Sequence, residues 1–341
     1  ILVDDGKLIF ELTESNVTDT VKTRVVAGGP LSSKKGVNLP NTKISQPSLT
    51  EKDRKDAAFL LDHQVDWLAL SFVRKEKDIL DLRKLVDAHP NNARIVAKIE
   101  KPEALEEIDE IIEAADAIMV ARGDLGVEVD FHKVPLIQKS IIKKCHMKSK
   151  PVIVATQMME SMIQNPTPTR AEANDVANAV LDGADSVMLS GETSVGKYPV
   201  ETIRNMQMII DSTETEEYIY YKEHMPLPGA KNFMADAICL SAVQLAEQVN
   251  AAAIVTLTYS GFTAIRISSH RPKAPIFTFT MNMDLINDLS LVWGVRTYYF
   301  GECTQINEYI EYTEEFLVSN NLLKKGDLVV HVGSIPILQK G

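Results

Sequence analysis

The pattern of apolar and polar positions changes near residue 45, and the two sides of this change predict different architectures. Residues 1–44 read as short β-strands. Two apolar runs within Ile1–Leu12 are separated by Asp5-Gly6, which is typical of a tight hairpin, and Val21–Val26 alternates in polarity. This segment has too few apolar side chains to build a core alone, so we interpret it as part of a small β module.

Beyond residue 45, short apolar runs rich in β-branched residues alternate with helical stretches. Such runs are expected for strands covered on both faces, and repeated strand–helix units predict a parallel sheet. The predicted strands are Asp66–Phe72, Arg94–Ile99, Ala117–Val120, Val152–Ala155 and Ser186–Leu189. The first predicted helix begins at a capping box over 48–51 and runs toward His63. The other predicted helices cover 76–88, 103–114, 133–147 and 171–182, and the last of them follows a capping box over 169–172. Five such units indicate a (β/α) barrel, which needs eight, so we expect three more units before Ile1.

A polar segment over 212–229 with two prolines separates these units from a second α/β series. There the predicted helix covers 233–249, and the predicted strands are Ala253–Leu257, Ile276–Thr280, Val295–Phe300 and Leu328–Val332. We therefore predict three domains: a partial β module over 1–44, barrel units over 45–212 and an α/β domain over 213–341.

Composition narrows the class of protein. The chain has 341 residues, 45% of them apolar, and a formal charge of −11 from 36 basic and 47 acidic residues. An acidic chain without a basic block is a weak candidate for binding nucleic acid or an anionic membrane. No run of eighteen apolar residues is present, which argues against a membrane span. The three cysteines lie far apart, so a reducing cytoplasm is the simplest location.

Polar residues stand at the ends of all five predicted barrel strands, where (β/α) barrels carry their chemistry. They are Ser71; Lys98 and Glu100; Arg122, Gly123 and Asp124; Thr156 and Gln157; and Ser190 and Glu192.

Lys98 and Glu100 are the sharpest local feature, because residues two apart on a strand share a face. With Asp124 at the end of the next strand, two carboxylates would suit Mg²⁺, which takes its other ligands from water and substrate phosphate. Lys98 would then face the negative charge that the reaction develops. The alternative is that these three side chains only pair with one another, and spacing alone leaves both interpretations open.

The other candidates also have a structural alternative. Thr156 could cap the following helix, and Ser190 and Glu192 could do the same beside the turn of Gly191 and Gly196. Residues 33–40 are predicted to be a loop, and its two adjacent lysines at 34–35 could bind a phosphate or be solvated. In the second domain, residues 258–263 could hold a phosphate at a helix start or form an ordinary N-cap turn. The seven histidines show no zinc-like spacing, and no Ser-His-Asp or Walker pattern is present.

Eight phrases in order give the chain a resemblance to the pyruvate kinase family from Ile1 to near its end. They are SKKGVNLP over 33–40, LSFVR over 70–74, AKIE over 97–100, MVARGDLG over 119–126, ATQMMESM over 155–162, PTRAE over 168–172, DVANAVLDGAD over 175–185 and MLSGET over 188–193. The resemblance implies a (β/α)8 barrel of the TIM type, present here as five of eight units, with a partial β lid and a C-terminal α/β domain.

The resemblance also implies a reaction, namely phosphoryl transfer from phosphoenolpyruvate to ADP, giving pyruvate and ATP. It implies that Glu100 and Asp124 bind Mg²⁺ or Mn²⁺ and that Lys98 stabilises the transferring phosphoryl group and the enolate. The remaining implied roles are substrate contacts by Ser71, Gly123, Asp124, Thr156 and Glu192, proton routing by Thr156 and Ser190, a nucleotide contact by Lys35, and an effector phosphate site at Thr258, Ser260, Gly261 and Thr263.

Further expectations follow from the same resemblance: a K⁺ ion whose ligands would precede Ile1, a sugar-phosphate effector, a homotetramer and a cytoplasmic location, with neither nucleic acid nor membrane as partner. Without the preceding barrel units, the piece given is expected neither to close the barrel nor to catalyse by itself. Two other functions remain open from the residues: a metal-dependent aldolase or lyase acting on pyruvate enolate, and a non-catalytic ligand sensor.

Overall fold

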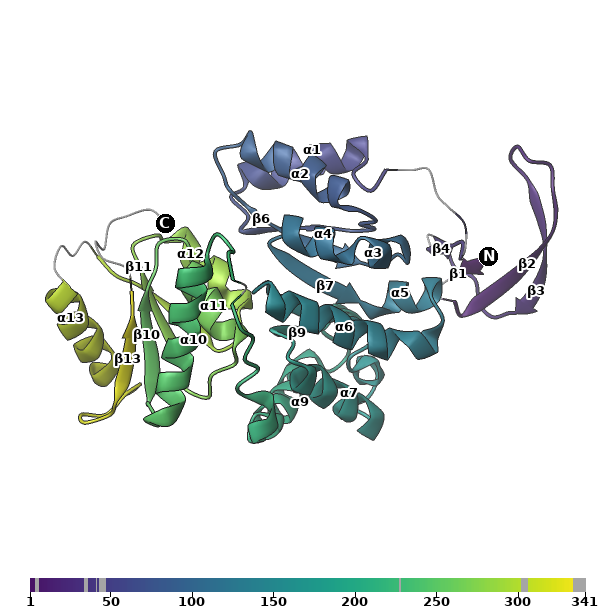
Figure 1. Ribbon diagram of the computed structural model, residues 1–341. Helices are drawn as coiled ribbons and strands as arrows, with labels where there is room; N and C mark the ends of the chain where they lie inside the picture. Colours follow the sequence, from purple (N-terminus) through teal and green to yellow (C-terminus); the bar gives the residue numbers. More distant parts are fainter. Residues whose placement is uncertain are drawn as a thin grey trace. The chain divides into compact units, whose positions relative to one another are not determined.

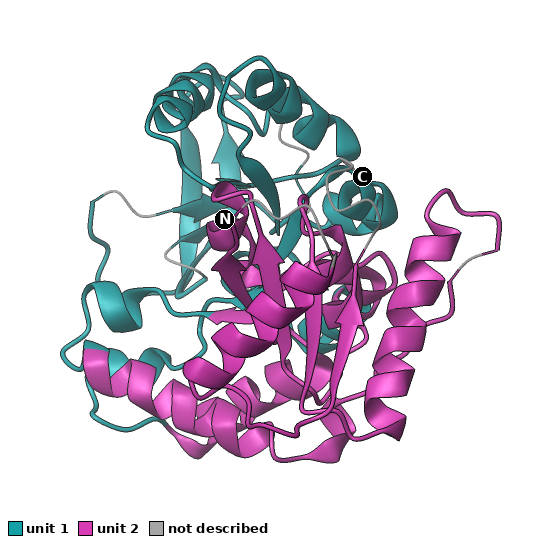
Figure 2. Ribbon diagram, turned by 90° about the vertical axis from the view of Figure 1, so that its left-hand side faces the viewer, with its two compact units in different colours: residues 1–141, 153–168, 188–199 teal, residues 142–152, 169–187, 200–341 magenta. Residues whose placement is uncertain are grey.

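The computed structural model describes residues 1–3, 6–33, 36–40, 42, 47–226, 228–301 and 306–333 (Figure 1). The chain divides into two compact units, which Figure 2 colours separately. Unit 1 comprises 1–141, 153–168 and 188–199, and unit 2 comprises 142–152, 169–187 and 200–341. Among the described residues, none of the helices has both the length and the apolar character needed to cross a bilayer.

A small antiparallel sheet forms the start of unit 1. Its strands are β1 (Leu2–Val3), β2 (Leu8–Ser15), β3 (Val21–Ala27) and β4 (Val37–Asn38), in the order β3-β2-β1-β4. The predicted hairpin is confirmed by the pairing of Leu2 with Ile9 and Val3 with Leu8. The stretch over 33–40, which we predicted as a loop, instead contributes β4, because Leu2 also pairs with Asn38 on the other side of β1.

The five predicted barrel strands are confirmed as one sheet in the order β5-β6-β7-β8-β9. They are β5 (Trp67–Leu70), β6 (Arg94–Ile99), β7 (Ala117–Ala121), β8 (Val152–Ala155) and β9 (Ser186–Met188). Neighbours β5 and β6, and β6 and β7, pair in parallel. Every residue of β7 and β8 is buried, as the continuous apolar runs predict for strands covered on both faces.

The helices between these strands follow the predicted spans with three differences. They are α1 (Glu51–Asp62), α2 (Glu76–Asp87), α3 (Glu103–Glu106), α4 (Ile108–Ala114), α5 (Arg122–Glu128), α6 (Val134–Met147), α7 (Arg170–Asp182), α8 (Gly191–Ser194) and α9 (Pro199–Thr213). The helix predicted over 103–114 is interrupted at Glu107, whose φ and ψ are −113° and 29°. Residues 122–128, 191–194 and 199–213, for which we predicted no helix, form α5, α8 and α9.

The third difference concerns the start of α1. The capping box predicted over 48–51 is wrong, since the N-cap is Thr50 and its reciprocal partner is Asp53. Ser48 instead donates its hydroxyl to the carbonyl of Phe72 at 2.7 Å. The capping box of Thr169 and Glu172 on α7 is confirmed.

Unit 2 contains a second parallel sheet, as predicted. The strands β10 (Ala253–Leu257), β11 (Ile276–Thr280), β12 (Val295–Tyr299) and β13 (Val329–Val332) lie in the order β12-β11-β10-β13, and the accompanying helices are α10 (Phe233–Gln248), α11 (Phe262–Ser269), α12 (Asp284–Asp288) and α13 (Ile306–Ser319). Side chains alternate between two cores. Ile254 packs with residues of α10 on one face, and Val255 packs with Phe279 and Leu317 on the other.

Acidification is expected to destabilise unit 2, because two of its histidines are buried in the neutral form. Burial, followed by the Arg271 charge, lowers the pKa of His146 to about 4, although Asp185 opposes the shift. Burial, followed by His224 and Arg266, lowers the pKa of His270 to about 3. Unfolded imidazoles bind a proton near pH 6.5, so from there down to the folded pKa the unfolded state holds more protons and stability falls. For His146 alone, the free energy of unfolding should fall by about 3 kcal/mol over this pH range.

Urea unfolding at pH 7.5, 5.5 and 4.5 measures this effect. The variant His270→Gln should show a smaller loss of midpoint on acidification, whereas His132→Gln, which alters an exposed ring, should behave as the wild type does. The prediction would be contradicted if the urea midpoint rose on acidification. It would also be contradicted if the midpoint of His270→Gln fell with pH as much as that of the wild type.

Candidate functional site

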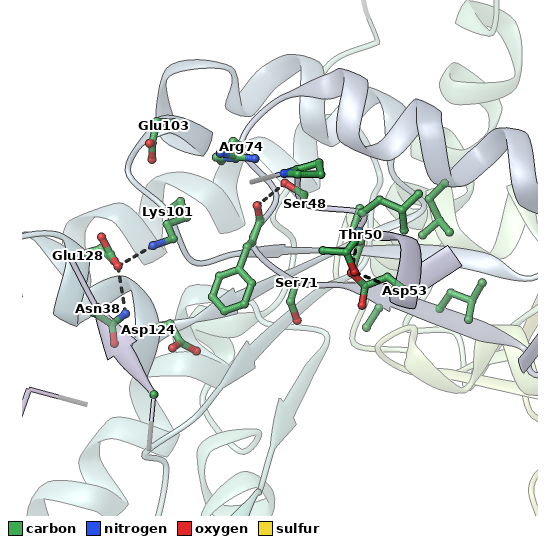
Figure 3. A pocket seen from close by; sticks show the side chains of 18 of the residues that line it. Asn38, Ser48, Thr50, Asp53, Ser71, Arg74, Lys101, Glu103, Asp124 and Glu128 are labelled. Atoms are coloured by element: carbon green, nitrogen blue, oxygen red, sulfur yellow. Dashed lines mark hydrogen bonds and ion pairs between the residues drawn. The ribbon is translucent and has the colours of Figure 1, made fainter. Parts of the chain in front are cut away.

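A cavity of about 1000 Å³ in unit 1 lies among α1, β4, β5, α5 and the turns that follow β5 and β6 (Figure 3). Its apolar wall comes from Leu49, Ala57, Leu60, Leu68 and Leu70. The polar side chains in its wall include Ser71, Lys101, Asp124 and Glu128. Several of these residues follow the carboxyl ends of β5, β6 and β7, which is where the sequence predicts the chemistry.

Lys98 and Glu100 meet at the end of β6. The ammonium lies 2.6 Å from Glu100 Oε1 and donates to Ser71 Oγ at 2.9 Å. The other oxygen of Glu100 accepts from the backbone N–H of Phe72 at 2.7 Å, and the residue is 1% exposed. A carboxylate this buried requires a cation beside it. The alternative, in which these charged side chains pair with one another, is therefore observed for Lys98 and Glu100. The pair does not prevent Glu100 from binding a metal ion, because Lys98 neutralises only part of the local negative charge.

Asp124 lies in α5, directly after the neighbouring strand. β6 and β7 are paired in parallel, with Ile99 opposite Val120, so Glu100 and Asp124 follow adjacent strand ends. Among the described residues, no three histidine, cysteine or acidic side chains form a group able to hold a metal alone. Two carboxylates completed by water and substrate phosphate are what Mg²⁺ commonly takes, so this donor set fits Mg²⁺ better than a closed protein site.

Thr156 directly follows β8 and has a left-handed backbone conformation, with φ of 71°. Its hydroxyl accepts a hydrogen bond from the backbone N–H of Gly123 in α5, at 2.7 Å. The idea that Thr156 caps the following helix is therefore wrong, since the 3-10 helix Glu160–Ile163 has Met159 at its N-cap. The structure brings Gly123 and Thr156 together, and a Cβ at position 123 would lie 3.2 Å from that hydroxyl.

Ser190 and Glu192 follow β9 at the start of α8, where Ser190 is the N-cap residue. Glu192 is 3% exposed and accepts from the N–H of Ser190 at 2.7 Å and from that of Met159 at 3.2 Å. Both oxygens of Glu192 thus bind backbone N–H groups at helix starts, whereas the Ser190 side chain makes no capping hydrogen bond. A substrate contact by Ser190 or Glu192 stays a prediction.

Two further predictions concern a nucleotide contact and an effector site. Lys35, the predicted nucleotide contact, falls outside the described residues. In unit 2, Thr258 accepts from the N–H of Gly261 at 3.0 Å, and Gly261 is the N-cap of α11 with φ of 82°. This geometry matches the ordinary N-cap turn. An effector phosphate at Thr258, Ser260, Gly261 and Thr263 stays a prediction.

Sequence reasoning missed an ion pair in the cavity wall. Lys101 lies 2.6 Å from Glu128 Oε1, with side chains 12% and 4% exposed, and Asn38 of β4 donates to the same oxygen at 3.0 Å (Figure 3). The only sequence signal for Lys101 is its place beside Glu100. Glu128 and Asn38 are 90 positions apart, so their contact could not be inferred from spacing.

Comparison with known proteins assigns the family. The family model described as "Pyruvate kinase, barrel domain" matches residues 1–203, and the one described as "Pyruvate kinase, alpha/beta domain" matches residues 236–341. The chain belongs to the pyruvate kinase family. A pyruvate kinase of Geobacillus stearothermophilus is 45% identical, with 100% of this chain and 58% of that protein covered. A pyruvate kinase of Agrobacterium vitis is 42% identical, with 100% of this chain and 71% of that protein covered.

A solved structure gives the same assignment. A pyruvate kinase from Cryptosporidium parvum matches with a TM-score of 0.89 and 35% identity over 99% of this chain and 70% of that one. The predicted fold class is thereby confirmed. The chain spans 55–58% of the first three curated relatives that it matches, so the activity of a whole pyruvate kinase is a proposal for this chain.

Proposed function

We propose that the polypeptide carrying this chain transfers the phosphoryl group of phosphoenolpyruvate to ADP, giving pyruvate and ATP. The observation that carries the proposal is the pair of half-buried Lys98 and buried Glu100 at the end of β6, with Asp124 following the adjacent strand. One ammonium and two carboxylates are enough for a reaction in which the protein mainly positions groups and stabilises charge. Membership of the pyruvate kinase family supports the same reaction.

In this proposal Glu100 and Asp124 hold Mg²⁺ or Mn²⁺. The ion supplies charge neutralisation on the transferred phosphoryl group when it is bound. Lys98 places its ammonium where negative charge accumulates on the phosphoryl oxygens and on the enolate oxygen. Thr156 orients the donor that delivers a proton to C3 of the enolate, with Ser190 near the same route, and Lys35 contacts the nucleotide. Ser71, Gly123 and Glu192 complete the substrate contacts.

The other functional expectations are proposals on the same footing. We propose a K⁺ requirement, a sugar-phosphate effector at the loop before α11, a homotetramer and a cytoplasmic location. Each is a property that the family resemblance implies.

A coupled assay on the whole polypeptide tests the reaction. With Mg²⁺, phosphoenolpyruvate and ADP we expect pyruvate and ATP in equal amounts, and no pyruvate when ADP is omitted. Cleavage of a 2-oxo acid without ATP would instead support the aldolase or lyase alternative. Ligand binding without turnover, unchanged in Lys98→Met, would support a sensor.

A further inference from the structure

The turn after β8 holds two consecutive residues in the left-handed region: φ is 71° at Thr156 and 54° at Gln157. A β-branched residue such as threonine is a genuine outlier there. Each such residue costs about 1–3 kcal/mol and persists only where its surroundings impose it. The fold must therefore contain groups that hold this turn.

Arg122, the first residue of α5, makes the most contacts to this turn. Its Nη2 donates to the carbonyl oxygen of Thr156 at 2.9 Å and approaches that of Gln157 at 3.5 Å and Met158 Sδ at 2.8 Å. Carbonyls of residues with positive φ point away from the usual strand direction, so a cation that binds them favours this backbone conformation over the relaxed one. The adjacent Gly123 N–H then binds the Thr156 hydroxyl itself.

A carboxylate also binds the backbone next to this turn. Glu192 accepts from the N–H of Met159 at 3.2 Å and is 3% exposed. A cation from the end of β7 thus binds carbonyls of the turn, and a carboxylate from the end of β9 binds one of its amides. Charged groups in these positions form the stronger class of hydrogen bond, about 1.5–3 kcal/mol each, which is enough to offset the backbone strain.

We infer that Arg122 is a positioning residue for the proposed reaction: through the carbonyls of Thr156 and Gln157 it fixes the left-handed turn and so aims the Thr156 hydroxyl. This inference rests on the proposed function, in which Thr156 serves protonation of the enolate. In that step the C2–C3 double bond supplies the electron pair for the new C3–H bond and C2 becomes the ketone carbonyl. The donor oxygen keeps the electrons of its O–H bond and regains a proton from water.

The planar guanidinium is what the geometry requires. All three contacts come from Nη2, at the tip of a planar group longer than a lysine side chain, whereas an ammonium is a point charge on a flexible stem. Arg122→Lys keeps the charge but not the planar group that carries Nη2, so it should loosen the position of Thr156 without removing a charge from unit 1.

The experiment is a double-mutant cycle on the whole polypeptide with Arg122→Lys, Thr156→Ala and their combination. We expect Arg122→Lys to lower turnover about 10- to 100-fold, the scale of a misplaced reacting group, with the KM for phosphoenolpyruvate within threefold of wild type. Exchange of the pyruvate methyl protons into D₂O should fall by the same factor. In the Thr156→Ala background the arginine change should cost less than threefold, because Arg122 acts through Thr156.

Arg83→Lys is the matched control, since Arg83 pairs with Asp116 and lines no part of the cavity. Wild-type activity in Arg122→Lys, or a full additional loss in the Thr156→Ala background, overturns the inference. A wild-type polypeptide that forms no ATP overturns the proposed function instead. A crystal structure of Arg122→Met separates the two independently of activity: Thr156 should relax to negative φ, and a left-handed Thr156 in that variant overturns the inference.

Discussion

Replacing Lys98 by methionine should lower turnover of the whole polypeptide by about 10³-fold or more while leaving metal binding largely intact, because its ammonium is paired with Glu100 at the end of β6. Methionine has a similar length, so the packing around β6 is retained. The change leaves Glu100, which is 1% exposed, without its neutralising partner. A carboxylate in that position attracts a divalent cation at least as strongly as before, so metal affinity should not fall.

The measurement has two parts, steady-state turnover in the coupled assay and Mn²⁺ titration of the same preparation. Lys84→Met is the matched control, since Lys84 forms an exposed pair with Asp81 at 2.8 Å and should be dispensable for turnover. Full activity in Lys98→Met, or loss of Mn²⁺ binding with the fold intact, would count against the role assigned to Lys98.

The sequence predicts the strands well where the spacing of apolar residues and the positions of polar residues indicate the same element. The strands of the two parallel sheets follow short apolar runs of strand length, and β10 and β11 have the predicted bounds. Lys98 and Glu100 could be placed together because a strand puts residues two apart on one face. Their partner Ser71 was found by the general rule that the chemistry of a barrel collects at strand ends.

The sequence could not predict which hydrogen-bond partner each polar residue has in the fold. Ser48 and Thr50 both fit a helix start, and only the packing of α1 decides that Thr50 caps it while Ser48 binds the turn after β5. The left-handed backbone at Thr156 is likewise invisible in a β-branched residue, since propensity argues against it. The arginine and the carboxylate that hold this turn lie 34 residues before Thr156 and 33 residues after Met159.

The strongest case of such a hidden partnership is Arg271 in unit 2. In the sequence it stands between His270 and Pro272 and resembles a surface residue. In the structure it is 2% exposed and lies 3.2 Å from Asp185 Oδ1, and it donates to the carbonyls of Gly183 at 2.6 Å and Ser268 at 2.9 Å. The Gly183 contact spans 88 positions, so a single guanidinium ties the end of α7 to the end of α11.

Arg271→Met should therefore destabilise unit 2 by about 3–5 kcal/mol, the usual cost of leaving one member of a buried ion pair without its partner. Asp185 would keep its backbone contacts from Val152 and Trp293 but would lose its cation. The guanidinium also lies 5.1 Å from the centre of the Trp293 ring, so the fluorescence of Trp293 should report the loss directly.

Urea unfolding followed by that fluorescence measures the effect. Lys273→Met is the control two positions away, because Lys273 forms an exposed pair with Glu217 at 3.4 Å and its loss should change stability by no more than about 0.5 kcal/mol. Asp185→Asn in the Arg271→Met background should recover part of the lost stability, because it removes the carboxylate charge left unpaired. Equal midpoints for Arg271→Met and Lys273→Met would mean that the buried guanidinium contributes no more than a surface charge does.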